Sequence, residues 1–172
     1  MRRSSVWRRR SRRPVTDPST PVQIELRPAL ADDVLWIVEL RALVLRADLE
    51  RLGRYDDVRV RQRFRDAFEP TETRIVVVEG TDVGSVAIRP EGGSRWLEHF
   101  YIATSHQGRG VGSRILAMVL DDPVLYRLNV LQGSPARRLY ARHGFVVESE
   151  DEVDVFMRLD RTGSRFENSA GR

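Results

Sequence analysis

The stretch that decides the fold is residues 107–113, which read QGRGVGS and stand between the strand-like run FYI (100–102) and a helical pattern that begins at Val111. Glycines at alternate positions let the backbone approach a ligand closely, and the free N–H groups and dipole of a helix N-terminus favour an anion. The spacing differs from the dinucleotide fingerprint GxGxxG, and the GxxxxGK[ST] loop needs a lysine that this chain lacks. The stretch therefore predicts either a phosphate-binding turn of another type or a tight turn that binds nothing.

Around this stretch, apolar residues alternate with a period of two in some segments and recur every three or four residues in others. The segments are separated by Pro28, Pro70 and Pro123 and by turns at residues 80–82 and 92–93. The order β, α, α, β, β, β, α, β, α, β, β predicts one α/β (α+β) domain, with a mixed, mostly antiparallel sheet of about seven strands and about four helices on its faces. Strands are expected at residues 22–27, 74–79, 83–89, 95–103, 125–131, 145–147 and 153–159, and helices at 32–53, 56–68, 111–119 and 135–143.

A second motif follows in residues 130–145, which read VLQGSPARRLYARHGF. The first motif resembles the Q/R-x-x-G-x-G/A loop of the GNAT superfamily of acyl-CoA-dependent N-acetyltransferases. The second resembles the family's later signature, in which an Asn-x-x-A-like stretch leads into Leu-Tyr-x-x-x-Gly-Phe. The order and separation of the two motifs and of the expected strands agree over residues 22–159, so the resemblance covers the whole expected domain.

The resemblance implies a site for acetyl-CoA as co-substrate. In the family the sheet splays between its fourth and fifth strands, here near Ile102 and Val130, and the cofactor enters the gap. The backbone of Ile102 would pair with the pantetheine arm and direct an N–H at the thioester oxygen. Ser134 stands where the family commonly has asparagine, and its hydroxyl could replace that contact. The expected pyrophosphate ligands are Gln107, Gly108, Arg109, Gly110, Val111, Gly112 and Ser113, with Arg114 adding charge.

Tyr140 resembles the family tyrosine that protonates the departing CoA thiolate. A phenol suits this task because its acidity is close to that of the leaving thiol. The alternative is that Tyr140, on a short amphipathic helix, only packs the core. Its position immediately before residues 141–145, ARHGF, favours the acid.

Glu98 is the candidate general base that takes the proton of the amine. Strict alternation would place it with Trp96 and Phe100 on one face of its strand, beside the transfer site, and would place His99 on the other face. The alternative reading makes Glu98 a structural carboxylate paired with Arg95. His99 is the second candidate base, and the two are not expected to serve one proton.

The composition limits the chemistry further. The chain has 172 residues, 41% of them hydrophobic, which is the size of one domain with its own core. No apolar run approaches the roughly 20 residues of a membrane span and no apolar signal segment is evident, so a bacterial cytoplasmic protein without membrane contact is expected. Cysteine is absent and the three histidines lack a metal-ligand spacing, so no metal is expected. Without a thiol to carry the acetyl group, direct transfer in a ternary complex is expected.

The basic charge is concentrated at the N-terminus. All 29 basic residues are arginine, and seven of them lie within residues 2–13. Residues 14–172 therefore contain 22 basic and 25 acidic residues and carry a formal net charge of −3. Residues 1–21 are therefore expected to be a disordered extension, or the product of a start site assigned too far upstream, and residues 161–172 a flexible tail. Nucleic-acid binding is not expected, although an arginine-rich arm could contact nucleic acid or anionic lipid.

The expected function is transfer of an acetyl group from acetyl-CoA to a primary amine of a small molecule or a protein N-terminus. By resemblance, residues 45–65 and the last hairpin select the acceptor, and their mixed charges favour no acceptor class. The alternative is a non-catalytic acyl-CoA-binding or regulatory module on the same fold. A homodimer through the last strands is expected by resemblance.

Overall fold

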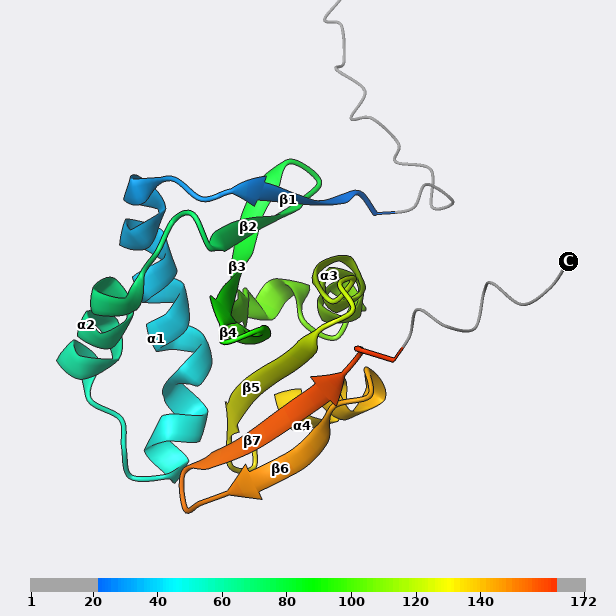
Figure 1. Cartoon of the computed structure of the whole chain (residues 1–172). Helices are drawn as coiled ribbons and strands as arrows, with labels where there is room; N and C mark the ends of the chain where they lie inside the picture. Colours follow the sequence, from blue (N-terminus) through cyan, green and yellow to red (C-terminus); the bar gives the residue numbers. More distant parts are fainter. Residues whose placement is uncertain (1–21, 164–172) are drawn as a thin grey trace, which may run out of the picture.

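The sheet consists of two halves that meet between its fourth and fifth strands (Figure 1). The computed structural model describes residues 22–163, so the expected extension 1–21 and most of the expected tail lie outside the described residues. Its seven strands run in the order β1-β2-β3-β4-β5-β7-β6, which confirms the expected mixed sheet. The elements are β1 (Ile24–Pro28), α1 (Val34–Arg51), α2 (Asp57–Ala67), β2 (Thr73–Val78), β3 (Thr81–Glu91), β4 (Ser94–Ile102), α3 (Val111–Val119), β5 (Leu125–Leu131), α4 (Ala136–Arg142), β6 (Val146–Glu150) and β7 (Asp154–Asp160).

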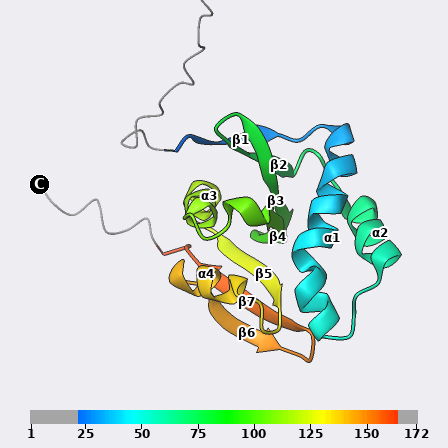
Figure 2. The same cartoon turned by 180° about the vertical axis from the view of Figure 1, so that it is seen from behind.

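Helices cover both faces of the sheet, as the sequence predicts (Figures 1 and 2). On one face, α1 and α2 bury Ile37, Val38 and Phe64 against Ile75 and Tyr101. On the other face, α3 and α4 pack against the second core cluster, whose fully buried members include Val76, Val86, Ile115, Leu116, Tyr126, Leu128 and Val155. None of the helices in the described part of the chain is long and apolar enough to cross a membrane.

The two helices on the first face begin differently. Asp56 caps α2, and its carboxylate accepts hydrogen bonds from the N–H groups of Val58 (3.0 Å) and Arg59 (2.7 Å). Asp33 stands at the cap position of α1 but makes no capping bond there. Its carboxylate instead pairs with Arg27 at 2.8 Å, and this guanidinium holds the pKa of Asp33 well below its usual range. Asp33 therefore fastens α1 to β1 through an ion pair.

The two halves of the sheet are joined by a short parallel ladder. β4 and β5 pair only at Ser94–Leu125, Arg95–Tyr126 and Trp96–Arg127. β4 continues to Ile102 and β5 to Leu131, so the strands separate beyond the third pair. The expected splay between the fourth and fifth strands is thus confirmed, and it opens at the end of β4 that leads into residues 107–113.

A bulge in β4 corrects the expected alternation of its side chains. Ser85 pairs with Tyr101 and Ala87 with Glu98, so His99 and Phe100 together oppose the single residue between them on β3. His99 has a φ of 50°, a left-handed conformation that is uncommon for a residue with a side chain. The bulge reverses the side-chain alternation, and the expectation that Glu98 and His99 lie on opposite faces is wrong.

Candidate active site

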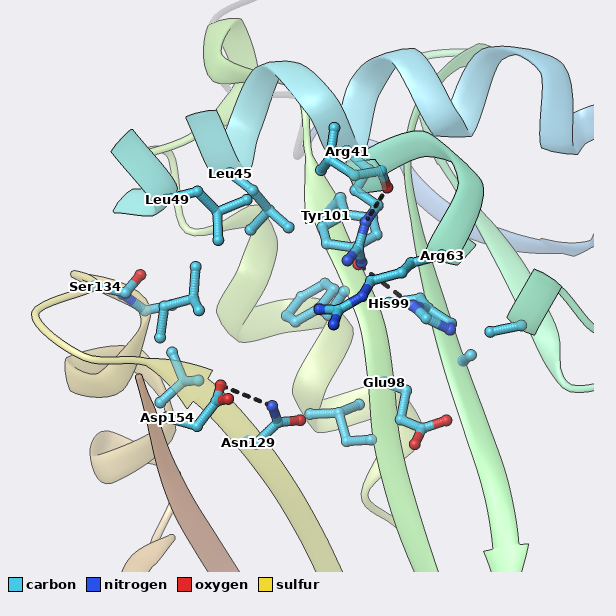
Figure 3. Close-up of a pocket in the computed structure, with 18 of the residues that line it drawn as sticks. Arg41, Leu45, Leu49, Arg63, Glu98, His99, Tyr101, Asn129, Ser134 and Asp154 are labelled. Atoms are coloured by element: carbon cyan, nitrogen blue, oxygen red, sulfur yellow. Dashed lines mark hydrogen bonds between the residues drawn. The ribbon is translucent and has the colours of Figure 1, made fainter. Parts of the chain in front are cut away.

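A cavity of about 900 Å³ lies at the splay between β4 and β5 and is lined from above by α1 and α2 (Figure 3). Its sheet side includes Glu98, His99 and Tyr101 from β4 and Asn129 from β5. Both of the expected groups beyond β5, Ser134 and Tyr140, line the same cavity. The helix side is formed by Arg41, Leu45, Leu49, Arg59, Val60 and Arg63.

Tyr140 is buried in the second core cluster and also borders the cavity. Its ring packs on Phe145 in an edge-to-face arrangement with centroids 5.9 Å apart. Burial, together with the neighbouring Tyr101, raises the pKa of the Tyr140 phenol well above its ordinary value of 10. Tyr140 therefore packs in the core and also borders the cavity, so its geometry is compatible with both the packing role and the role of an acid.

Tyr101 is the centre of a hydrogen-bonded group on the floor of the cavity. Arg41 donates from Nη1 to the Tyr101 hydroxyl, and its guanidinium carbon lies 5.6 Å from the Tyr101 ring centroid. The Nδ1 atom of His99 lies 3.3 Å from the same hydroxyl. Because Arg41 donates to the phenol oxygen, the phenol proton is free to point to His99 Nδ1.

His99 is half-buried, with its ring edge-on to Phe64 at 4.9 Å between centroids. Burial, with a smaller contribution from the positive charge of Arg41, lowers the pKa of His99 to about 4. His99 is therefore neutral at pH 7 and is a weak proton acceptor.

The lowered pKa of His99 predicts an acid-sensitive fold. Between pH 6.5 and 4 the unfolded chain binds a proton at this position that the folded chain does not, so stability rises with pH in this window. We expect the free energy of unfolding to fall by up to about 1.4 kcal/mol per pH unit as the pH drops through it. Urea unfolding at several pH values measures this slope. The slope should decrease in His99→Gln and persist in His106→Gln, a histidine outside the cavity; an unchanged slope in His99→Gln contradicts the assignment.

Glu98 is paired, but with a partner that the sequence did not indicate. Its two carboxylate oxygens accept from Arg89 Nε (3.1 Å) and Nη2 (3.0 Å) across the β3–β4 ladder. Arg95, the expected partner, instead pairs with Asp122. The Phe100 side chain packs into the core on the opposite face, so it does not flank Glu98. Glu98 still borders the cavity, and a carboxylate with two occupied lone pairs keeps further acceptor positions.

The end of β4 presents peptide groups to the splay. Ala103 N–H donates to Val83 O on β3 at 2.8 Å, so the preceding peptide groups, those of Ile102, face β5. The side chain of Gln107 confirms this direction, because its Nε2 donates to Ile102 O at 2.8 Å. Gln107 thus fastens the glycine-rich loop to the strand before it.

The loop itself is open. Gly108 and Gly110 have φ values of +71° and +77°, and a Cβ at either position would meet nothing within 4 Å. Gly110 is the cap of α3, whose first-turn N–H groups, those of Val111, Gly112 and Ser113, point out of the helix end. Gly112 differs from these two glycines, because its Cβ would lie 3.0 Å from Leu139 Cδ2, where α3 packs closely on α4.

Three expected cofactor ligands have protein partners. Ser113 Oγ lies 2.7 Å from His143 Nε2, and Arg114 Nη1 donates to Val22 O at 2.7 Å. Ser134 Oγ faces Ala136 N–H at 3.5 Å at the start of α4. Arg109 is exposed on the loop. The structure therefore brings the expected loop residues together at one end of the splay. Among them, Arg109 contributes an exposed positive charge.

Sequence reasoning missed several residues that shape the cavity. Arg41 stands between Val38 and Leu45 in the apolar stripe of α1, and a charged residue in such a stripe was an available signal. Arg63 and Tyr101 carry no comparable signal, because only the bulge and the crossing of α2 over β4 place them at the site.

Comparisons with known proteins agree with this geometry. Residues 71–147 match the model of the acetyltransferase (GNAT) domain. PaiA N-acetyltransferase from Thermoplasma acidophilum, in complex with coenzyme A, has a similar structure, with a TM-score of 0.64, 17% sequence identity and coverage of 80% of this chain and 99% of that chain. An N-acetyltransferase from Staphylococcus aureus Mu50 gives a TM-score of 0.60, 16% identity and coverage of 78% and 98%. No curated protein sequence matches the chain.

A third structure carries an acceptor mimic. Naa50 from Arabidopsis thaliana, in complex with the bisubstrate analogue CoA-Ac-MVNAL, matches with a TM-score of 0.57 and 18% identity over 80% of this chain and 98% of that chain. At such identities the likeness concerns the fold. The chain has the fold of the GNAT N-acetyltransferases. Together with the domain match, this confirms the resemblance to the GNAT superfamily inferred from the two motifs.

Proposed function

We propose that this protein is an N-acetyltransferase that moves the acetyl group of acetyl-CoA to a primary amine in a ternary complex. The observation that carries the proposal is the coincidence of three features at one splay: the open glycine loop, the peptide of Ile102 facing β5, and the Tyr140 side chain bordering the cavity. The absence of cysteine excludes a thiol as acetyl carrier and favours direct attack by the amine.

The residues present suit acetyl-CoA as co-substrate, which supplies the acetyl thioester. Backbone N–H groups of Gly108 to Ser113 suit the pyrophosphate, with Arg109 adding charge. The N–H of Ile102, which faces the splay, suits the thioester oxygen, where negative charge develops during attack. Ser134 lines the cavity and stands in the sequence where the family commonly has asparagine, so its hydroxyl is the proposed replacement for that contact with pantetheine.

Two side chains serve the proton transfers in this proposal. As the amine nitrogen bonds to the acetyl carbon and the carbon–sulfur bond breaks, Glu98 accepts the amine proton directly or through a water. Tyr140 donates its phenolic proton to the sulfur. It is protonated at neutral pH, the form that an acid requires, but burial raises its pKa, so it is a weaker acid than a free phenol and its acidity no longer matches that of the leaving thiol.

Binding of the co-substrate tests the proposal without knowledge of the acceptor. We expect acetyl-CoA and CoA, each at 100 times its dissociation constant, to raise the free energy of unfolding by about 2.7 kcal/mol, while NAD has no effect. Thermal unfolding of the full chain measures this. Thiol release with a panel of amines then reports turnover, without background because the protein has no cysteine.

A pair of glycine variants distinguishes the loop from general stability. Gly110 (φ +77°) and Gly92 (φ +53°) both have positive φ and open space, so an alanine at either causes similar backbone strain. Only Gly110→Ala should reduce the stabilisation by acetyl-CoA, because Gly92 lies in the β3–β4 turn. Equal stabilisation of both variants, or no stabilisation of the parent protein, refutes the proposal.

A further inference from the structure

The arginines on the helix side of the cavity have no acidic partners. Arg41, Arg54, Arg59 and Arg63 all line the cavity, and none of them forms a salt bridge with a carboxylate in the described residues 22–163. Arg41 donates hydrogen bonds to two neutral groups, the Tyr101 hydroxyl and the carbonyl of Val60. Within the described residues, the guanidinium groups of Arg54, Arg59 and Arg63 are therefore available to an anion in the cavity.

The acidic side chains of the cavity are, by contrast, occupied by protein groups. Glu98 is bidentate on Arg89, and Asp154 accepts from Asn129 Nδ2 at 2.9 Å (Figure 3). Three more cavity carboxylates, those of Asp56, Glu69 and Asp151, accept hydrogen bonds from nearby backbone N–H groups in caps and turns. The carboxylate of Glu72, which also lines the cavity, accepts no such bond within residues 22–163. Within residues 22–163, none of these carboxylates forms a salt bridge with Arg41, Arg54, Arg59 or Arg63.

The two faces of α2 differ in the same way. Arg61, on the face away from the cavity, pairs with Glu39 (2.8 Å) and Asp57 (2.7 Å). Arg59 and Arg63, one turn apart on the cavity face, place two like charges side by side, which destabilises a helix. An anion between them would relieve this repulsion, and guanidinium groups bind carboxylate and phosphate in a bidentate manner.

Arg63 reaches from α2 into the cavity beside Tyr101 and His99 (Figure 3). The two groups next to it carry no negative charge, because His99 is neutral and Tyr101 is a phenol held by Arg41. Glu98 lies on the sheet side of the same cavity, below His99 in this view, and pairs with Arg89 of β3. Arg63 and Glu98 therefore line the same cavity, Arg63 from its helix side and Glu98 from its sheet side.

We propose that the acceptor is a small primary amine that also carries an anionic group, a carboxylate or a phosphate, which Arg59 and Arg63 bind while the amine faces Glu98. This inference rests on the proposed acetyltransferase function and names its substrate class. The cavity volume of about 900 Å³ lies within the range of small-molecule sites, and α1, α2 and the β6–β7 turn all line it.

Matched acceptors test the anion requirement. Acetyl-CoA-dependent thiol release is measured with α-amino acids and their carboxamides, and with phosphoethanolamine and ethanolamine. We expect kcat/KM for at least one anionic amine to exceed that of its neutral counterpart tenfold or more, and the two series identify the anion as carboxylate or phosphate. Turnover of neutral amines or of peptide N-termini without any preference for the anion overturns the inference but leaves the proposed function intact.

Variants on one helix locate the anion. Arg63→Gln should raise KM for the preferred anionic amine about tenfold, with kcat and the stabilisation by acetyl-CoA little changed, and should not affect the neutral counterpart. Arg59→Gln should act in the same direction. Arg65→Gln, exposed on α2 outside the cavity, is the matched control and should change nothing. Equal effects on anionic and neutral amines overturn the inference.

A binding experiment covers the case in which no amine turns over. N-acetyl amino acids, N-acetyl amino acid amides, N-acetyl phosphoethanolamine and N-acetyl ethanolamine are titrated into the full chain, with and without CoA. We expect that, in the amino acid pair or in the phosphoethanolamine pair, the anionic compound binds at least tenfold more tightly than its neutral counterpart. Arg63→Gln should abolish this difference. No preference for the anion in either pair overturns it. Loss of acetyl-CoA stabilisation, with the anion preference intact, refutes the proposed function alone.

Discussion

Replacing Tyr140 with phenylalanine is expected to lower kcat about 100-fold, the low end of the effect of losing a general acid. Without the phenol, the sulfur must leave as a thiolate or wait for a proton from water. The ring of phenylalanine keeps the edge-to-face contact with Phe145 and the burial of the side chain, so the fold should be preserved. Steady-state thiol release, with the best amine of the panel, measures the change.

The controls for Tyr140→Phe separate chemistry from packing. Stabilisation by acetyl-CoA and KM for acetyl-CoA should remain within about twofold of the parent protein, because the lost proton acts only during the reaction. The raised pKa also fixes the sign of the alkaline behaviour: the phenol is active when protonated, so Tyr140 should cause no loss of activity below about pH 10. A fall in kcat of less than threefold would mean that Tyr140 only packs the core.

Much of the fold could be predicted because its signals are local. The pattern of β5 gave its bounds as Leu125–Leu131 without error, and Pro135 and Gly144 enclose α4 as expected. The splay between β4 and β5 was expected from the resemblance to the GNAT superfamily, and the three-residue ladder confirms it. Where a segment's own residues decide its conformation, the sequence was sufficient.

The arrangement of the site was harder to predict because it depends on contacts distant in the chain. A strict period of two placed His99 opposite Glu98, and a single extra residue in β4 reversed this. The partner of Glu98 is Arg89, nine residues away across a ladder whose register depends on the same bulge. The arginines of α2 reach the cavity only because α2 packs beside α1 above β4. These positions follow from tertiary packing, which local periodicity does not describe.

The second large effect is expected from Gly84→Ala, on the strand opposite the bulge. A Cβ on Gly84 would lie 2.3 Å from the carbonyl oxygen of Tyr101 and 3.3 Å from the Cα of Ile102, both backbone atoms that cannot rotate away. The change should lower the free energy of unfolding by about 3 kcal/mol, as for a badly overpacked core position. Urea unfolding measures the loss.

Gly163→Ala is the matched control, because its Cβ would meet nothing within 4 Å and its φ is not positive. It should change the free energy of unfolding by no more than about 0.5 kcal/mol. Gly84→Ala should also weaken stabilisation by acetyl-CoA, since relief of the clash displaces the backbone of Tyr101 and Ile102 at the end of β4. A loss of stability without loss of acetyl-CoA binding would show that β4 moves as a whole and that the cofactor depends on the loop alone. A loss below 1 kcal/mol would show that the bulge adapts freely, and the close approach of β3 to β4 would then have no part in holding the splay open.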